Sequence, residues 1–297
     1  MERGSMGARE RGKQLKAVKR RSIFLPLSRS LALPLCLLAS CVPVDQLPPG
    51  LVPQSPTAAT TTAFGELDPG NATVTSTHFT IKGYSQTDLD TLKASAENII
   101  NKIGTDTGLY SFLASQSYAI VAYRDRDEYL KKTHQPQWSH AVIADKAIYF
   151  YYPDPDADAT LAHYITHLVF DNYMADKAAT YRWLEEGLAM SEEVSKMSDA
   201  DRSTYQNSKT SQLRQNRMAF TQMTFFVTNT EEKRRTDAWY QQVESVVTYL
   251  LSQGSPLAFA QFLSELKSAE IDQAISDAYP SKFRSFSDLE AAWKYTI

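Results

Sequence analysis

The sequence predicts an α+β fold in which a small β-sheet with helices comes first and a helical half follows. Two observations support this prediction. Residues 78–83 and 117–125 alternate in side-chain character as strands do, whereas 86–104 repeats its apolar residues with the spacing of an amphipathic helix. The patterns beyond residue 153 are helical, and the chain has no internal repeat. Strands in one half and helices in the other are typical of an α+β domain.

The first half also contains a short helix and a hairpin. Residues 125–133 continue the second strand as a short helix, and residues 140–152 form two strands joined by a turn at 144–146. This turn lacks the glycine that is common in tight hairpin turns. We expect the second strand of the hairpin, 147–152, to flank a cleft as an edge strand, where an extended chain could add to the sheet.

The second half opens with two helices of functional interest. The first lies within 153–174 and is preceded by proline and aspartate breakers, with Asp156, Asp158 or Thr160 as its N-cap. The second, within 182–197, contains a glycine that costs about 1 kcal/mol relative to alanine, which suggests close packing or a metal nearby. A polar stretch follows. Further helices are predicted at 237–253, 257–268, 269–279 and 285–296.

The N-terminus has the pattern of an exported protein. Residues 1–40 place a basic segment before a short apolar run, as a secretory signal does, and the run ends in Leu-Ala-Ser-Cys. This ending resembles the lipobox of bacterial lipoproteins and implies lipidation of Cys41, although a plain signal with an incidental cysteine is the alternative. We expect a flexible tether at 41–76 and the folded domain at 77–297. Because valine and not aspartate follows Cys41, the outer membrane or cell surface is favoured over the inner membrane.

Charge and cysteine content exclude several classes of function. The first 40 residues hold nine Lys/Arg and two Asp/Glu, which leaves the rest with 22 basic and 32 acidic side chains, a net charge of about −10. Such a body repels nucleic acid and anionic lipid, so membrane attachment would depend on acyl chains at Cys41. The only other cysteine, Cys36, lies within the signal, so the mature domain has neither a disulfide nor a thiolate ligand for a metal.

Two histidines and a later glutamate have the spacing of a zinc site. His163 and His167 are four residues apart, and side chains at this spacing project from the same face of a helix. Eighteen residues separate His167 from Glu186 in the next helix. Two histidines and a carboxylate are a common ligand set for catalytic zinc, with the fourth position left for water.

These residues resemble the gluzincin metallopeptidases and, among them, small peptidase MA-like domains. The segment 183–189, Trp-Leu-Glu-Glu-Gly-Leu-Ala, matches the W-L-x-E-G-x-A motif that supplies the glutamate ligand in that clan. The resemblance covers about residues 77–297 and implies a zincin-like fold. It further implies zinc bound by His163, His167 and Glu186, and makes Asp171 a possible acceptor for the other ring N–H of a metal-bound histidine.

The residue between the two histidines departs from this family pattern. Gluzincins have H-E-x-x-H, but here Tyr164 occupies the position of the glutamate that acts as general base. A phenol with an ordinary pKa near 10 donates hydrogen bonds at neutral pH and is not a base. The neighbouring Glu185 is expected to be a solvated charge, Tyr240 a core residue and His140 a surface histidine.

Three functions follow as hypotheses. The first is a lipid-anchored, zinc-binding pseudopeptidase of the bacterial cell envelope that binds a peptide or protein without efficient hydrolysis. The second is an active zinc metallopeptidase with an unorthodox general base. The third is a metal-free structural module of the envelope. The sequence does not specify the oligomeric state, the substrate or the partner.

Overall fold

The computed structural model describes residues 64–226, 228 and 233–297, and within them the fold is α+β as predicted. The strands of this part form one mixed sheet in the order β1-β2-β3-β5-β4. Strands β2, β3 and β5 are parallel, whereas β1 and β4 pair antiparallel with their neighbours at the two edges. The strands are β1 (Ala72–Thr75), β2 (Phe79–Gly83), β3 (Tyr118–Tyr123), β4 (Ala141–Ala144) and β5 (Ala147–Tyr151).

The hairpin of β4 and β5 forms where the sequence predicts it, but its outer strand is the first one. β5 lies between β3 and β4, so the expectation that residues 147–152 form an edge strand is wrong, and β4 is the edge. Asp145 and Lys146 make the turn with φ values of 50° and 62°. Both residues therefore adopt the left-handed conformation of a two-residue type I′ turn without a glycine.

Helices pack on both faces of this sheet, and further helices extend the domain beyond one of the faces. They are α1 (Gln86–Thr107), α2 (Tyr110–Leu113), α3 (Arg126–Thr133), α4 (Ala157–Met174), α5 (Arg182–Lys196), α6 (Asp199–Asn216), α7 (Phe220–Met223), α8 (Lys233–Ser252), α9 (Pro256–Glu265), α10 (Ile271–Ala278) and α11 (Phe286–Lys294), with a 3-10 segment, η2 (Ala175–Tyr181), between α4 and α5.

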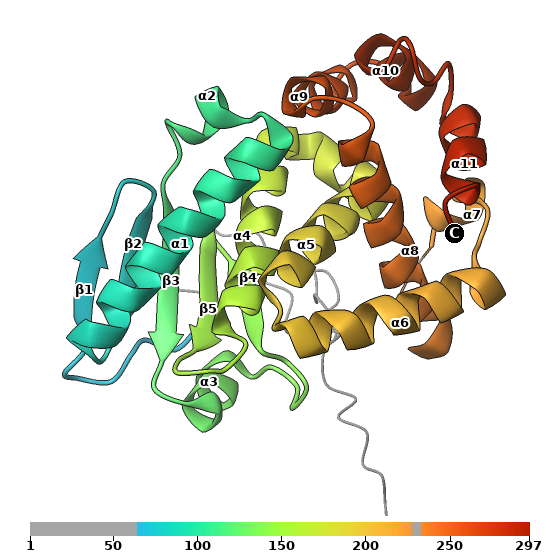
Figure 1. The fold of residues 1–297 in the computed structure, drawn as a ribbon. Helices are drawn as coiled ribbons and strands as arrows, with labels where there is room; N and C mark the ends of the chain where they lie inside the picture. Colours follow the sequence, from blue (N-terminus) through green and yellow to red (C-terminus); the bar gives the residue numbers. More distant parts are fainter. Residues whose placement is uncertain (1–63, 227, 229–232) are drawn as a thin grey trace, which may run out of the picture. The chain divides into compact units, whose positions relative to one another are not determined.

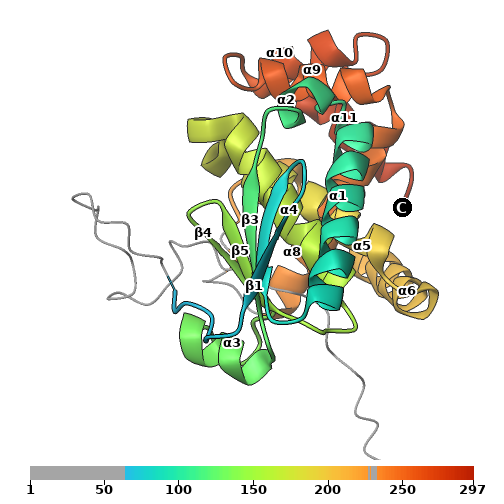
Figure 2. The same ribbon diagram turned by 90° about the vertical axis from the view of Figure 1, so that its left-hand side faces the viewer.

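The sheet is packed on both faces. Helices α1 and α4 cover one face, while α3 packs on β3 and β5 from the other, where Tyr123, Tyr129 and Tyr149 form a small aromatic core (Figure 2). Helix α5 packs on α4, α8 packs on α5, and α6 packs on α8. These helices follow one another on the side of α4 away from the sheet, as Figure 1 shows. Helix α4 therefore lies in the middle of the domain.

Two segments are more ordered than the sequence suggests. Strand β1 pairs with β2 although residues 72–75 belong to the predicted tether, and Gly65 donates its N–H to Lys132 O, so the folded part begins before Thr77. The polar stretch after residue 197 is the 18-residue helix α6. Its core contact comes from few buried residues, chiefly Tyr205 and Leu213, and so small an apolar stripe escapes a search for helical periodicity.

The predicted signal peptide, Cys41 and most of the predicted tether lie outside the described residues. Within the described part, no helix combines the length and the apolar character that a membrane span requires.

Candidate metal centre

Helix α4 carries the two histidines into the interior. It packs between α1, β4 and α5, and almost every position from Ala157 to Phe170 is buried. His163 and His167 lie one turn apart and are 0% and 6% exposed, and their Nε2 atoms are 3.1 Å apart. Since buried polar atoms require partners, two imidazole nitrogens this close are suited to sharing one ligand.

Glu186 of α5 completes a three-residue group. Its side chain is buried, and its Oε2 lies 3.6 Å from His167 Nε2. One ligand atom from each of His163, His167 and Glu186 falls within 4.8 Å of the others, so this group could hold a metal ion. Within the described residues Glu186 Oε2 has no hydrogen-bond partner, which is costly for a buried carboxylate oxygen unless a cation binds it.

Gly187 explains how α5 brings Glu186 to this place. A Cβ atom at Gly187 would lie 2.5 Å from the carbonyl oxygen of Val243 and 2.5 Å from Cγ2 of Val247, both on α8. Only glycine allows α5 and α8 to approach so closely. The glycine within the predicted helix is thus explained by helix packing, and that packing fixes the depth at which Glu186 sits.

The other nitrogen of each histidine faces a second glutamate of α5. His167 Nδ1 is hydrogen-bonded to Glu185 Oε1 at 2.5 Å, and His163 Nδ1 lies 2.7 Å from Glu193 Oε2. A carboxylate at Nδ1 fixes the ring orientation and makes the remaining nitrogen more basic. Both Nε2 atoms are therefore directed toward each other, where one ion could contact both.

The predicted role of Glu185 needs correction. Glu185 is not a solvated charge, because its side chain is 13% exposed and is bonded to His167. Asp171, a possible acceptor for a histidine N–H, lies close enough to Glu185 and His167 to interact electrostatically with both. Partial loss of hydration and the negative charge of Glu185 raise the pKa of Asp171 to about 6.

Arg182 adds a positive charge beside the carboxylate ligand. Its Nε lies 3.7 Å from Glu186 Oε1, the oxygen that is not directed at His167. Burial alone would raise the pKa of Glu186, but interactions with His167, His163 and Arg182 outweigh it and lower the pKa. Glu186 is thus held as a carboxylate, the form that a metal requires.

Tyr164 lies beside the histidines and reaches toward the sheet. Its ring centre is 5.3 Å from that of His163, and its hydroxyl donates a hydrogen bond of 2.8 Å to the carbonyl of Ala141 in β4. The side chain is 4% exposed. The side chain that lies between the two histidines in sequence is therefore a buried hydrogen-bond donor.

Two other residues considered from the sequence lie apart from the group of His163, His167 and Glu186. Tyr240 is 2% exposed and packs edge-on against Trp239 at 5.0 Å, which agrees with a core role. His140 is partly buried, and its Nδ1 lies 3.0 Å from the hydroxyl of Tyr151 and 3.7 Å from Asp154 Oδ2. Its expected surface position is therefore only partly correct.

Glu193 belongs to the site, although from the sequence it is expected to lie too far along its helix for a direct role. It lies seven residues after Glu186, which is two helical turns, so the two side chains share a face of α5. That periodicity was a usable signal. The contacts run in opposite order along the two helices. Glu185, early in α5, contacts the later histidine, His167, and Glu193, two turns further on, contacts the earlier histidine, His163.

Comparison with known proteins does not assign the site. No protein-family model matches the chain, and no curated protein matches it. Support for a metal site therefore comes from the described residues and not from relatives. These residues include a buried group of two histidines and a glutamate that could hold a metal ion, and a further glutamate lies at the second nitrogen of each histidine.

Proposed function

We propose that this protein is a lipid-anchored envelope protein whose folded domain binds zinc, derives from a gluzincin-type metallopeptidase, and binds a peptide or protein segment without efficient hydrolysis. The observation that carries the proposal is the buried Oε2 of Glu186, which faces His167 Nε2 and has no hydrogen-bond partner among the described residues. Two neutral imidazoles and a carboxylate suit zinc, which prefers nitrogen and oxygen ligands of this kind.

The hydrolytic step is the part that the chain lacks. Bound zinc would polarise a carbonyl and lower the pKa of a bound water. Removing a proton from that water is the task of the motif glutamate, and Tyr164 cannot take it over because its hydroxyl donates to Ala141 O. Glu185 and Glu193 are both paired with histidines, so neither replaces the missing base.

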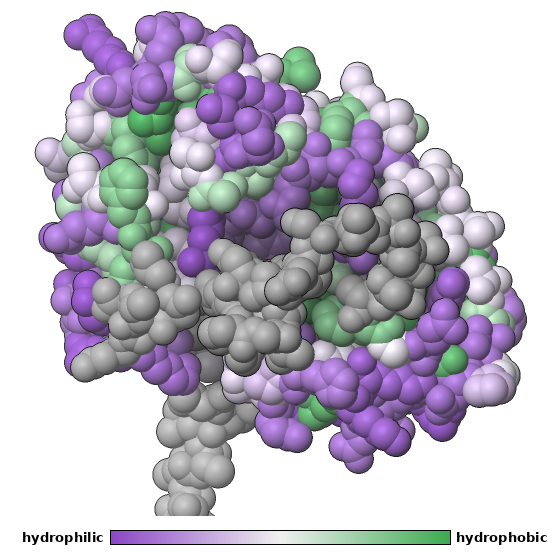
Figure 3. Space-filling view, turned by 180° about the vertical axis from the view of Figure 1, so that it is seen from behind, coloured by the Kyte–Doolittle hydropathy of each residue, from purple (hydrophilic) through white to green (hydrophobic). Residues whose placement is uncertain are grey.

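The edge strand β4 supports binding of an extended chain. Ala144 and Ala147 flank the two-residue turn, so Ala141 and Ile143 direct their backbone groups away from β5. Tyr164 already bonds the carbonyl of Ala141, which leaves Ile143 as the position where a peptide strand could pair. Figure 3 shows that the face opposite to that of Figure 1 is hollowed near its middle and that hydrophilic residues line part of the hollow, which favours a ligand rich in hydrogen-bonding groups.

The experiment that tests the proposal is the zinc content of the purified full-length protein after dialysis. We expect near-stoichiometric zinc in the parent protein and its loss in His163→Ala and in Glu186→Ala. His140→Ala serves as the matched control, since His140 pairs with Tyr151 and Asp154 and should leave the zinc content unchanged. A parent protein without zinc would refute the metal site.

Activity is tested separately with unfolded casein. The zinc-loaded parent should cleave it no faster than His163→Ala does, and Tyr164→Glu should restore metal-dependent cleavage if the remaining geometry of a peptidase is intact. Metal-dependent cleavage by the parent that is lost in His163→Ala would contradict the loss of hydrolysis and support a working peptidase.

A further inference from the structure

Arg182 is a cation beside the candidate metal centre, and most of its N–H donors are not needed to hold the three candidate ligands. It is the first residue of α5 and lies one turn before Glu186, so both side chains project from one face of the helix. The Nε of Arg182 is 3.7 Å from Glu186 Oε1, too far for a hydrogen bond. The arginine side chain is 22% exposed, so a ligand entering from solvent can reach it.

Two contacts from outside α5 hold the guanidinium in place. Nη2 donates a hydrogen bond of 2.8 Å to Thr228 Oγ1, and the guanidinium carbon lies 5.5 Å from the ring centre of Trp239 on α8. Cation–π packing and a hydrogen bond on different sides restrict the long side chain. Arg182 is therefore oriented before a ligand arrives, which lowers the entropic cost of binding.

Most donors of this guanidinium are not used by the described protein. A guanidinium carries five N–H groups. One is bonded to Thr228, and the buried Nε has no hydrogen-bond partner among the described residues. The nearby carboxylates are engaged elsewhere, Glu185 with His167 and Glu193 with His163. The remaining donors of a guanidinium whose Nε lies 3.7 Å from Glu186 Oε1 suit a planar anion.

We propose that Arg182 recognises a carboxylate of the ligand at the metal centre and that the ligand class is a peptide with a free C-terminal carboxylate. This inference rests on the proposed peptide-binding function and adds which part of the peptide is recognised. A terminal carboxylate matches the fork of the guanidinium in shape and charge, and a peptide offers it whatever its sequence.

The test compares two pools of random hexapeptides without Asp and Glu, one with free C-terminal carboxylates and the other amidated. Zinc-loaded full-length protein should retain the free-acid pool roughly tenfold better than the amidated pool, as expected for a charge-assisted pair. Arg182→Met should abolish this preference and lower only the retention of the acid pool. Arg182→Lys keeps the charge without the fork and should be intermediate. Lys233→Met, which removes an exposed cation of α8, should behave as the parent.

Zinc is measured in every variant, so the two proposals can fail independently. Equal retention of both pools by the parent, retention of neither pool, or an unchanged preference in Arg182→Met would overturn the role of Arg182 while zinc binding stands. Loss of zinc in Arg182→Met would also overturn it, since the side chain would then serve to hold Glu186. Absence of zinc from the parent would refute the proposed function itself.

Discussion

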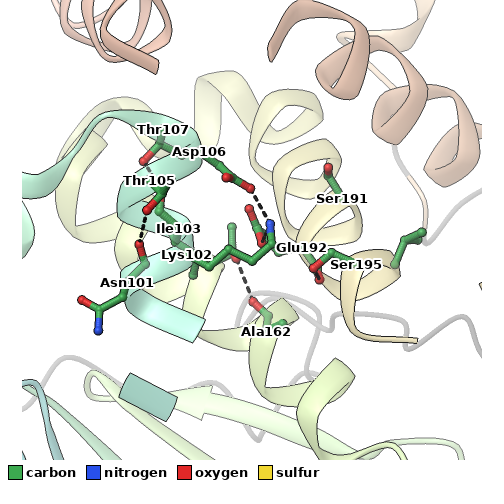
Figure 4. Close-up of polar contacts among 12 residues, drawn as sticks. Asn101, Lys102, Ile103, Thr105, Asp106, Thr107, Ala162, Ser191, Glu192 and Ser195 are labelled. Atoms are coloured by element: carbon green, nitrogen blue, oxygen red, sulfur yellow. Dashed lines mark hydrogen bonds and ion pairs between the residues drawn. The ribbon is translucent and has the colours of Figure 1, made fainter. Parts of the chain in front are cut away.

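Helix α5 contributes to two buried ionic groups that differ in where their positive charge comes from. On one side, Glu192 pairs with Lys102 of α1 at 2.9 Å, and Lys102 also pairs with Asp106, as Figure 4 shows. On the other side, Glu186 joins the histidines of α4. Both glutamates are 1% exposed. Glu192 has a lysine within hydrogen-bonding distance. Glu186 Oε2 has no hydrogen-bond partner of any kind among the described residues.

This difference indicates what each group requires in order to be stable. A buried carboxylate is tolerated when a cation and hydrogen bonds compensate it. Lys102 does so in part for Glu192. The histidine group has three glutamates of α5, at positions 185, 186 and 193, and Arg182 as its permanent cation. The remaining positive charge that would balance these carboxylates must come from protons on the histidines or from a divalent ion. The comparison therefore predicts that only the second group responds to metal.

The largest expected effect is that of removing the metal. If zinc binds as proposed, free zinc at 1,000 times the Kd stabilises the native protein by about 4 kcal/mol by mass action. Chelation should then lower the melting temperature of the full-length protein by roughly 10 °C, given a few degrees per kcal/mol for a domain of this size. Thermal unfolding with and without a chelator measures this shift.

Two variants tell whether the shift belongs to the histidine group. His163→Ala should melt at the same temperature with and without chelator, while Glu192→Gln should show the full shift because it alters only the lysine-containing group. An equal effect of the chelator on the melting temperature of His163→Ala would place the metal elsewhere. The conclusion that the histidine group is the one that responds to metal would then be wrong.

The sequence was sufficient to find the three candidate ligands because the spacing of the two histidines is local. Residues four apart on a helix, as in His163 and His167, share a face in any fold. The W-L-x-E-G-x-A segment added Glu186 through resemblance, and Gly187 marked a close helix contact that the structure locates on α8. Strands β2, β3, β4 and β5 were also predictable, since the alternation of their side chains reports burial on two faces, whereas β1 lies in the segment predicted as a tether.

The remainder depended on tertiary contacts that no local pattern contains. Whether Glu185 is solvated or bonded to His167 depends on the rotation of α5 against α4, and the edge position of β4 depends on the parallel pairing of β5 with β3. The same is true of Lys102 and Glu192, which are 90 residues apart in sequence. Such contacts become visible only once the helices are packed.

The second prediction uses pH to probe the lysine-containing group. Burial, only partly offset by Lys102, raises the pKa of Glu192 to about 7. The native state thus binds a proton that the unfolded chain has lost, so stability falls as pH rises from about 4.5 through 7. Glu192→Gln cannot ionise. Urea unfolding at pH 5 and pH 8 should show its stability relative to the parent improving by about 3 kcal/mol at the higher pH.

The control for this prediction lies on the same lysine-bearing helix. Asp90→Asn removes an exposed carboxylate that pairs with Lys93 at 2.9 Å, and such surface pairs contribute little to stability. Its stability should follow that of the parent at both pH values. Parallel pH curves for Glu192→Gln and the parent would mean that Lys102 fully compensates Glu192, and the two ionic groups would then differ even more than proposed.

The smallest expected effect distinguishes the hydrogen bond of Tyr164 from a role in metal binding. Tyr164→Phe removes the bond to Ala141 O, whose other partner is the hydroxyl of Ser139 at 3.2 Å, and should cost about 1 kcal/mol in urea unfolding. Because the phenol reaches toward β4, zinc content should stay the same. A lower zinc content in Tyr164→Phe would instead mean that the hydroxyl leaves Ala141 to ligate the ion. Tyr164 would then occupy the position that a zinc peptidase reserves for water, and the proposed loss of hydrolysis would have a second cause besides the proposed absence of a general base.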